Sequence, residues 1–269
     1  MPLSDTVTAV ILGLVEGITE FLPISSTGHL IVAGDLLQFE SAFSRVFDVV
    51  IQLGAILAVV WLYRTKLLHT VATLRRDPQS RAFARNVLLA FLPAVFIGLA
   101  AHGYIKKHLF SSRVVAIAWI VGGIAILLVE KFRPAERIRS TEEMPPKTAL
   151  AIGFWQCLAM VPGTSRSGAT IVGAMLSGVS REAATEFSFF LAIPTMVAAT
   201  VLDLWKARHD LGSGEWNLIA IGFVIAFFSA LVVVRWLVGF VSRHGFAPFA
   251  WYRIAAGILT LGVLYSAHG

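Results

Sequence analysis

The chain has 269 residues, of which 57% are hydrophobic and only 14% are charged, and its mean hydropathy is +0.78. A soluble globular domain carries about 25% charged residues, so this shortage of charge excludes an ordinary soluble fold and indicates a polytopic membrane protein. The net charge of +6 lies mainly in short connections, where positive residues set membrane orientation. No basic surface interleaved with aromatic residues accompanies it, so we expect no nucleic-acid partner.

The first apolar segment, residues 7–40, is too polar and too broken to cross a membrane as one regular helix. Its centre, GLVEGITEFLPISSTGHL from Gly13 to Leu30, contains two carboxylates, a proline and a hydroxyl-rich turn. Irregular backbone is tolerated at membrane depth only where it is buried in protein or lines a cavity, so we predict a re-entrant helix pair. Because ionisable residues inside a membrane segment usually mark a functional site, we also predict half of an active site here.

Six later segments approach the roughly 20 apolar residues that a membrane-spanning helix needs. The predicted spans are residues 43–63, 86–102 and 114–130 in the first half, and residues 187–204, 216–237 and 248–266 in the second. A second interrupted segment, residues 148–178, lies between the two sets and should be another re-entrant pair. Residues 64–85 and 132–147 are expected to form charged loops. The fold class is therefore an all-α polytopic membrane protein, with one domain over residues 1–269.

The two interrupted segments resemble each other. GLVE at residues 13–16 matches GFWQ at residues 153–156 at an offset of 140. PISSTG at residues 23–28 matches PGTSRSG at residues 162–168 with one extra residue. This similarity predicts an internal repeat, with chance likeness between small-residue turns as the alternative.

Each half of the chain, residues 1–131 and residues 148–269, contains one interrupted segment followed by three spans. An odd number of crossings in each half gives the two halves opposite orientations. Inverted repeats whose interrupted helices meet near the membrane midplane are a recurrent architecture, and such paired segments indicate the binding site. We therefore predict an inverted-topology repeat with the site between the two halves.

Loop charges predict which way the chain is threaded. The loops 64–85 and 131–147 carry eleven Lys and Arg residues, against five in the connections 102–113 and 205–215. Because cytoplasmic loops are enriched in positive residues, the first two should be cytoplasmic and both termini should face outward.

Glu16 and Glu20 are four residues apart, so they share one face of a helix. Two carboxylates on one buried face repel each other, so we expect a cation beside them. That cation is Arg166, a divalent metal ion, or both. The alternative is that the two carboxylates lie at a helix end in contact with water.

The turn that follows, Ser25-Ser26-Thr27-Gly-His29, is lined with hydroxyls. If a helix begins at Ser26 or Thr27, its free backbone N–H groups could face an anion. One helical turn separates Ser26 from His29, which would bring the imidazole near Ser26 Oγ as a base beside a nucleophile. The alternative is a solvated histidine and hydroxyls that bond only to backbone.

The partner stretch GTSRSGAT contains Ser165, Arg166, Ser167 and Thr170 and has the composition of a phosphate-cradling loop. The forked cation of Arg166 suits phosphate oxygens, although the Gly-Lys-Ser/Thr ending of a Walker A motif is missing. Ser167 or Thr170 could instead cap the following helix. Together the two segments predict cleavage of a phosphoester or phosphoanhydride in a lipid-linked substrate.

Four other polar residues in apolar surroundings carry a weaker signal. Asp48, Gln52, Glu186 and Arg253 could support the site or could pair for structural reasons. Aromatic residues at the ends of spans, Tyr252 among them, are most simply residues of the membrane interface.

These motifs resemble those of the bacterial undecaprenyl-diphosphate phosphatases, the bacitracin-resistance family. The resemblance rests on EGITEFLPISSTGH at residues 16–29, FDVVIQLG at 47–54, PGTSRSGAT at 162–170 and EFSFFLAIP at 186–194, and extends over nearly the whole chain. It implies hydrolysis of undecaprenyl diphosphate to the monophosphate, which recycles the carrier lipid for peptidoglycan and other wall polymers. Bacitracin resistance would follow, because bacitracin sequesters the diphosphate.

The resemblance also implies roles for individual residues. By motif they are the acidic pair Glu16 and Glu20, the nucleophile Ser26 with Ser25 as its possible substitute, the motif histidine His29, and the phosphate-binding Arg166 flanked by Ser165 and Thr170. A divalent cation, Mg²⁺ or Ca²⁺, is implied as a cofactor, with Glu16 and Glu20 as its oxygen ligands. The expected surroundings are a multi-pass position in the bacterial plasma membrane, a site open to the periplasmic side, a lipid-linked diphosphate substrate and membrane lipids. A homodimer is left open.

Two alternatives to a serine-dependent hydrolase remain at this point. Water, activated by His29 or Glu20, could attack phosphorus directly instead of Ser26. The inverted repeat also suits a transporter, so the chain could be a flippase of a prenyl phosphate lipid. A type-2 phosphatidic-acid phosphatase is less consistent, because its histidine shortly after Ser165-Arg166 is missing.

Overall fold

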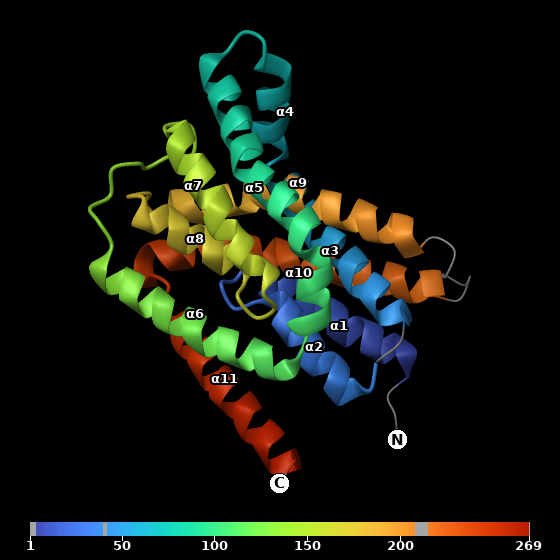
Figure 1. Cartoon of the computed structure of the whole chain (residues 1–269). Coiled ribbons are helices and arrows are strands. Elements are labelled where there is room, and N and C mark those ends of the chain that lie inside the picture. Colours follow the sequence, from blue (N-terminus) through green and yellow to red (C-terminus); the bar gives the residue numbers. More distant parts are fainter. Residues whose placement is uncertain (1–3, 40–41, 208–214, 269) are drawn as a thin grey trace.

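A computed structural model describes residues 4–39, 42–207 and 215–268 of the chain, and helices dominate this part of it (Figure 1). In chain order they are α1 (Asp5–Thr19), α2 (Ser26–Leu37), α3 (Ala42–Leu62), α4 (Arg64–Thr73), α5 (Pro78–His108), α6 (Ser112–Phe132), α7 (Pro146–Gln156), the 3-10 helix η1 (Cys157–Met160), α8 (Arg166–Leu176), α9 (Arg181–Ala207), α10 (Glu215–His244) and α11 (Ala247–His268). The described residues contain no strand, only one isolated bridge between Ile138 and Val179. The predicted all-α class is confirmed.

Among the described residues, five helices are long and apolar enough to cross a membrane. They are α5 over Pro78–Ala100, α6 over Ser112–Phe132, α9 over Arg181–Leu202, α10 over Trp216–His244 and α11 over Ala247–Ser266. The remaining predicted span, residues 43–63, corresponds to helix α3. It passes the same test only together with α4, and the two helices are bent by 72° relative to each other. The polytopic prediction is therefore confirmed for the described chain.

The prediction of a loop at residues 64–85 is wrong. This stretch contains α4 and the first turns of α5, and Figure 1 shows the two helices projecting from the bundle as a hairpin. Asp77 caps α5 by accepting from the backbone N–H groups of Gln79 and Ser80, and Pro78 occupies the first turn, where it needs no hydrogen-bond donor. The charge of the stretch correctly indicated contact with water, but charge does not exclude a helix.

Both predicted interrupted segments are helix–turn–helix units. In the first, α1 and α2 flank a turn, and in the second, α7 and η1 precede a turn that leads into α8. Ser25 and Ser165 cap α2 and α8 in the same unusual conformation, with φ of 72° and 76°. Each hydroxyl accepts from the N–H group three residues later, at Gly28 (3.3 Å) and Gly168 (3.0 Å). The 140-residue offset in the sequence is thus repeated in the backbone.

The two halves exchange a helix with each other. Helix α10 belongs to the second half but packs against α1 and α3 of the first. Helix α5 belongs to the first half but packs against α7 and α9 of the second. A Cβ added at Gly13 would lie 2.5 Å from the carbonyl oxygen of Gly222 in α10, and one added at Gly153 would lie 2.4 Å from that of Ala90 in α5. Equivalent glycines therefore allow equivalent close helix contacts, as a repeat requires. The inverted orientation of the two halves stays a prediction.

The two loops predicted to be cytoplasmic meet in the structure. Lys66 of α4 lies 2.5 Å from a carboxylate oxygen of Glu142 and donates to the hydroxyl of Thr141 at 2.9 Å. Partial burial raises the pKa of the Glu142 carboxyl, but the hydrogen bond and charge of Lys66 outweigh it and leave that pKa below its usual value. The other predicted side is less complete, because most of the connection 205–215 lies outside the described residues.

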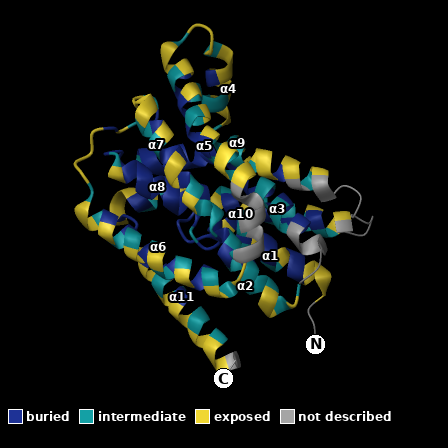
Figure 2. Cartoon of the chain, in the orientation of Figure 1, coloured by how far each residue is buried: buried dark blue, intermediate teal, exposed yellow. Residues whose placement is uncertain are grey.

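Burial follows the pattern of a membrane protein (Figure 2). Buried residues gather around α8 and the centre of the bundle, whereas the outer faces of α5, α6 and α11 are exposed and apolar. Phe96, Val121 and Leu259, for example, are 69%, 61% and 70% exposed. Apolar surface of this extent is unfavourable in water, and hydrocarbon tails would cover it in a bilayer.

The close helix contacts give a stability prediction. Gly153→Ala and Gly13→Ala should both destabilise the protein, because each new Cβ would meet a carbonyl oxygen at about 2.5 Å. Overpacking of this kind costs about 1–3 kcal/mol, so the midpoint of thermal unfolding in detergent micelles should fall. Gly239→Ala on α10 is the matched control, since no described residue lies within 4 Å of its new Cβ. Unchanged midpoints for both close-packed variants would contradict the packing.

Candidate active site

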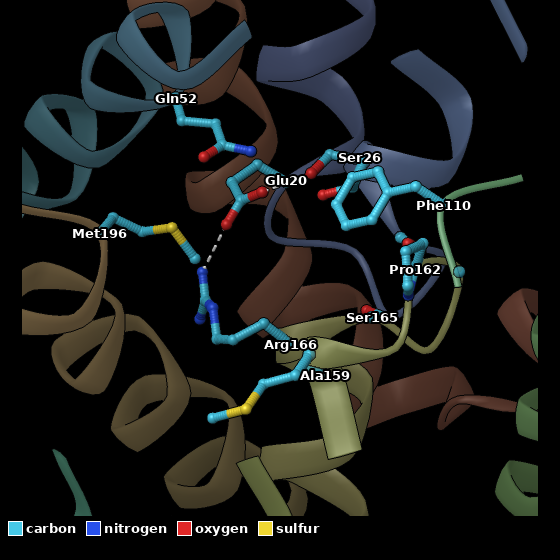
Figure 3. A pocket seen from close by; sticks show the side chains of 13 residues that line it. Glu20, Ser26, Gln52, Phe110, Ala159, Pro162, Ser165, Arg166 and Met196 are labelled. Carbon is cyan, nitrogen blue, oxygen red and sulfur yellow. Dashed lines mark hydrogen bonds and ion pairs between the residues drawn. The ribbon is translucent and has the colours of Figure 1, made fainter. Parts of the chain in front are cut away.

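The two interrupted segments are joined by a buried ion pair. Glu20 ends the first helix and Arg166 begins α8, and Arg166 Nη2 lies 2.8 Å from Glu20 Oε1 (Figure 3). The two side chains are only 4% and 7% exposed. Arg166, one of the cations expected beside the carboxylates, therefore reaches Glu20.

Helix α9 fixes the other side of the guanidinium. Arg166 Nη1 donates to the carbonyl oxygen of Ser188 at 2.8 Å and to its hydroxyl at 3.1 Å. Thr170 donates to the same hydroxyl at 2.8 Å. Within the described chain Arg166 Nε is buried without a partner. Ser188 was not predicted as a site residue, although it lies inside the EFSFFLAIP motif that pointed to this helix.

Ser26 opens α2 and donates its hydroxyl hydrogen to Glu20 Oε2. Glu20 thus accepts from Ser26 with one oxygen and from Arg166 with the other. A hydroxyl held by a carboxylate is the arrangement of a nucleophile beside its base. The group next to Ser26 is therefore Glu20, and the expected contact with His29 is not formed.

His29 bonds to groups other than Ser26. Its Nδ1 donates to the carbonyl oxygen of Ser25 at 2.7 Å, and its Nε2 lies 2.7 Å from the hydroxyl of Tyr252. The imidazole stacks on Tyr252 and lies against Trp119. The expected contact with Ser26 is not formed because both ring nitrogens are engaged elsewhere, by the carbonyl oxygen of Ser25 and the hydroxyl of Tyr252. Tyr252 supports His29, and its place at a span end gave no sign of this.

Glu16 is completely buried beside the pair. Neither of its carboxylate oxygens has a hydrogen-bond partner in the part of the chain that the structure describes, and its charged neighbours are Glu20 and Asp48. A buried carboxylate without a partner is costly, so this position suits a bound cation or a proton. The described residues hold no cluster of three or more Asp, Glu, His or Cys side chains suited to a metal. Two carboxylates are nevertheless what Mg²⁺ uses where substrate phosphates complete its coordination.

A cavity of about 160 Å³ opens over the ion pair. Glu20, Ser26 and Arg166 form its polar floor, and Ser25, Thr27, Gln52 and Ser165 also line it. The rim is apolar and consists of Phe110, Ala159, Met160, Pro162 and Met196, several of which are labelled in Figure 3. The N-termini of α2 and α8 begin at this floor, where helix ends favour anions. The cavity therefore suits a ligand with a phosphate head and a hydrocarbon tail.

A family model described as "Bacitracin resistance protein BacA" matches residues 9–259 of the chain. The chain belongs to this family. The match extends over both interrupted segments and all the helices that line the cavity, so the site lies within the BacA region.

Curated relatives agree with this assignment. Undecaprenyl-diphosphatase of Cereibacter sphaeroides (strain ATCC 17025) is 55% identical over 262 residues, 97% of each chain. Undecaprenyl-diphosphatase of Rhizorhabdus wittichii is 56% identical, covering 94% of this chain and 95% of its own. Undecaprenyl-diphosphatase 2 of Rhodospirillum rubrum is 57% identical, covering 99% and 97%.

Within this BacA site, two of the expected phosphate-binding hydroxyls are engaged elsewhere. Ser167 donates to the carbonyl oxygen of Leu22 at 2.7 Å, and Thr170 bonds to the backbone of Arg166 as well as to Ser188. Neither lines the cavity, whereas Ser25, Thr27 and Ser165 do. Ser167 therefore ties its turn to the first one, and Thr170 links α8 to α9. Neither caps α8, as the alternative had it, because the cap is Ser165.

Proposed function

We propose that this chain hydrolyses undecaprenyl diphosphate to undecaprenyl phosphate and inorganic phosphate. The three relatives named above are undecaprenyl-diphosphatases, and they match nearly the whole chain. The observation that carries the proposal is the contact of Ser26 and Arg166 with the same carboxylate, Glu20, at the floor of the cavity. Phosphoryl transfer depends mainly on positioning and on charge stabilisation, and these three groups supply both.

In the proposed mechanism the diphosphate first competes with Glu20 for Arg166. Its negative oxygens bind the guanidinium and the N–H groups at the starts of α2 and α8. Ser26 Oγ then attacks the terminal phosphorus, and its proton passes to Glu20. The bond to the bridging oxygen breaks, and undecaprenyl phosphate leaves. Water hydrolyses the phosphoserine, which releases inorganic phosphate and restores the serine.

His29 has a positioning role in this proposal. Its ring nitrogens bond to Ser25 and Tyr252, so it holds the turn that carries Ser26 and takes no proton from that hydroxyl. Direct attack by water, with Glu20 as base, is the variant that leaves Ser26 as a binding group.

A test of the covalent route compares Ser26→Ala with Ser266→Ala, an exposed hydroxyl on α11. We expect kcat for undecaprenyl diphosphate to fall at least about 100-fold in Ser26→Ala, because the nucleophile and its proton transfer are lost together. Acid quenching of wild type with substrate labelled at the terminal phosphate should trap phosphoserine at position 26. Near-normal turnover by Ser26→Ala would leave direct attack by water as the mechanism.

A divalent cation, Mg²⁺ or Ca²⁺, is part of the proposal, with Glu16 and Glu20 as the residues that would hold it. When bound, it would supply positive charge to the oxygens of the diphosphate. Chelation should abolish hydrolysis and added Mg²⁺ should restore it. Glu16→Gln should need several-fold more Mg²⁺ for half-maximal rate, measured by titration against wild type. An unchanged Mg²⁺ requirement would remove Glu16 from the metal site.

We propose a multi-pass position in the bacterial plasma membrane, with the cavity open to the outer side. Phe110 lies on the cavity rim, in the short connection between α5 and α6 that the loop charges predict to be outside. The opposite loops meet through Lys66 and Glu142. A site on the outer side would recycle the carrier lipid of peptidoglycan where the polymer is assembled. The flippase alternative has no supporting observation beyond the repeat, and the homodimer stays a prediction.

Cysteine labelling tests this orientation. In a Cys157→Ser background, Phe110→Cys should react with a membrane-impermeant maleimide added to intact spheroplasts. Arg76→Cys, at the tip of the hairpin between α4 and α5, should react only after the membrane is permeabilised. The opposite pattern would reverse the assignment of both loops.

A further inference from the structure

Arg253 of α11 is a buried charge that the proposed chemistry does not use. It is 1% exposed, does not line the cavity, and forms no ion pair with a carboxylate in the described chain. A buried guanidinium is costly unless its donors are satisfied, so its contacts should explain its presence.

Two contacts of Arg253 reach the turns that carry the site. Its Nη1 donates to the carbonyl oxygen of Pro23 and its Nη2 to that of Gly163, both at 3.0 Å. Those carbonyls are equivalent at the offset of 140, each two residues before a capping serine, Ser25 or Ser165. One guanidinium therefore binds equivalent carbonyl oxygens in the two halves.

The remaining contacts of Arg253 anchor its side chain to α6. Arg253 Nη2 also donates to the carbonyl oxygen of Ala118 at 2.9 Å, and Nε to that of Trp119 at 3.3 Å. The slot that receives the side chain depends on glycines: a Cβ at Gly122 would lie 2.0 Å from Nη2, and one at Gly168 would lie 3.1 Å from Nη1. A flat, forked side chain fits such a slot, and a single ammonium group could not reach both turns in the same way.

The turns themselves need an external hold. Ser25 and Ser165 both have φ above 70°, a conformation that costs free energy in a residue other than glycine and persists only where the surroundings fix it. The residue after each serine is a member of the site: Ser26 in one turn and Arg166 in the other. The distance between them therefore depends on how the two turns are held together.

We propose that Arg253 is a positioning residue that sets the separation of Ser26 and Arg166 by clamping the two turns. It acts through the backbone and does not touch the substrate. This inference rests on the proposed phosphatase function, but it also predicts the affinity of the site for inorganic phosphate, which can be measured without turnover.

The test uses Arg253→Lys and Arg253→Met in the full chain, purified in detergent. Misplacement of a site by about 1 Å can cost about 100-fold in rate, so we expect kcat/KM for undecaprenyl diphosphate to fall at least tenfold, part of it through a higher KM. The Kd for inorganic phosphate, followed by calorimetry, should rise several-fold. A merely structural role would lower the fraction of active protein and the fitted stoichiometry, but it would leave KM and the phosphate Kd unchanged.

A second variant disturbs the clamp while keeping the arginine. Gly122→Ala would push the guanidinium out of its slot, so it should reproduce the changes in KM and phosphate Kd. Gly262→Ala, on the same helix as Arg253 and with no described residue within 4 Å of the new Cβ, is the matched control and should behave as wild type.

The outcomes separate the two proposals. A folded Arg253→Lys with wild-type KM and wild-type phosphate Kd would overturn the clamp. If Arg253→Met does not fold, the lysine and Gly122→Ala variants decide, because the first keeps the charge and the second keeps the whole side chain. A wild-type protein that binds phosphate but hydrolyses no prenyl diphosphate would defeat the phosphatase proposal and leave the clamp to be judged on the phosphate Kd.

Discussion

The buried ion pair of Glu20 and Arg166 is the contact on which the rest of the structure depends. It joins residues 146 positions apart, and it requires the end of one interrupted helix to meet the start of another. Either partner alone would be an uncompensated charge in an apolar interior, which typically costs about 3–5 kcal/mol. The exchanged helices, the glycine contacts and the capped turns together provide the place where the two charges meet.

The same pair connects fold to proposed chemistry. Without substrate, Arg166 neutralises Glu20, and Glu20 in turn holds the hydroxyl of Ser26. A ligand must carry enough negative charge to draw the guanidinium away from the carboxylate. A diphosphate draws the guanidinium away better than a monophosphate does. This difference fits the proposed reaction, in which the site binds the diphosphate and releases the monophosphate. Glu16, buried beside the pair with no hydrogen-bond partner among the described residues, fits the same need for added positive charge.

The sequence predicted those parts of the site that break the rules of a membrane segment. Glu20 and Arg166 stand out because charge is rare in apolar stretches, and the capping serines stand out because they repeat at a fixed offset. Ser188 and Tyr252 could not be found in this way, since neither carries a charge and their contacts depend on how distant helices pack. The direction of His29 depends on a side-chain rotation that spacing does not determine. The charge in residues 64–85 correctly predicted contact with water, but it led to the wrong prediction of a loop where the structure has helices.

The serine caps of α2 and α8 have a further consequence. Ser26 and Arg166 occupy the same position in the two copies of the turn, the first residue after the cap. Two identical copies would place serine against serine or arginine against arginine, and neither combination offers a nucleophile and a cation together. A symmetric ancestor built from one repeat could therefore have the frame of this site but not its chemistry. Divergence at this one equivalent position gives the first half the nucleophile, Ser26, and the second half the cation, Arg166.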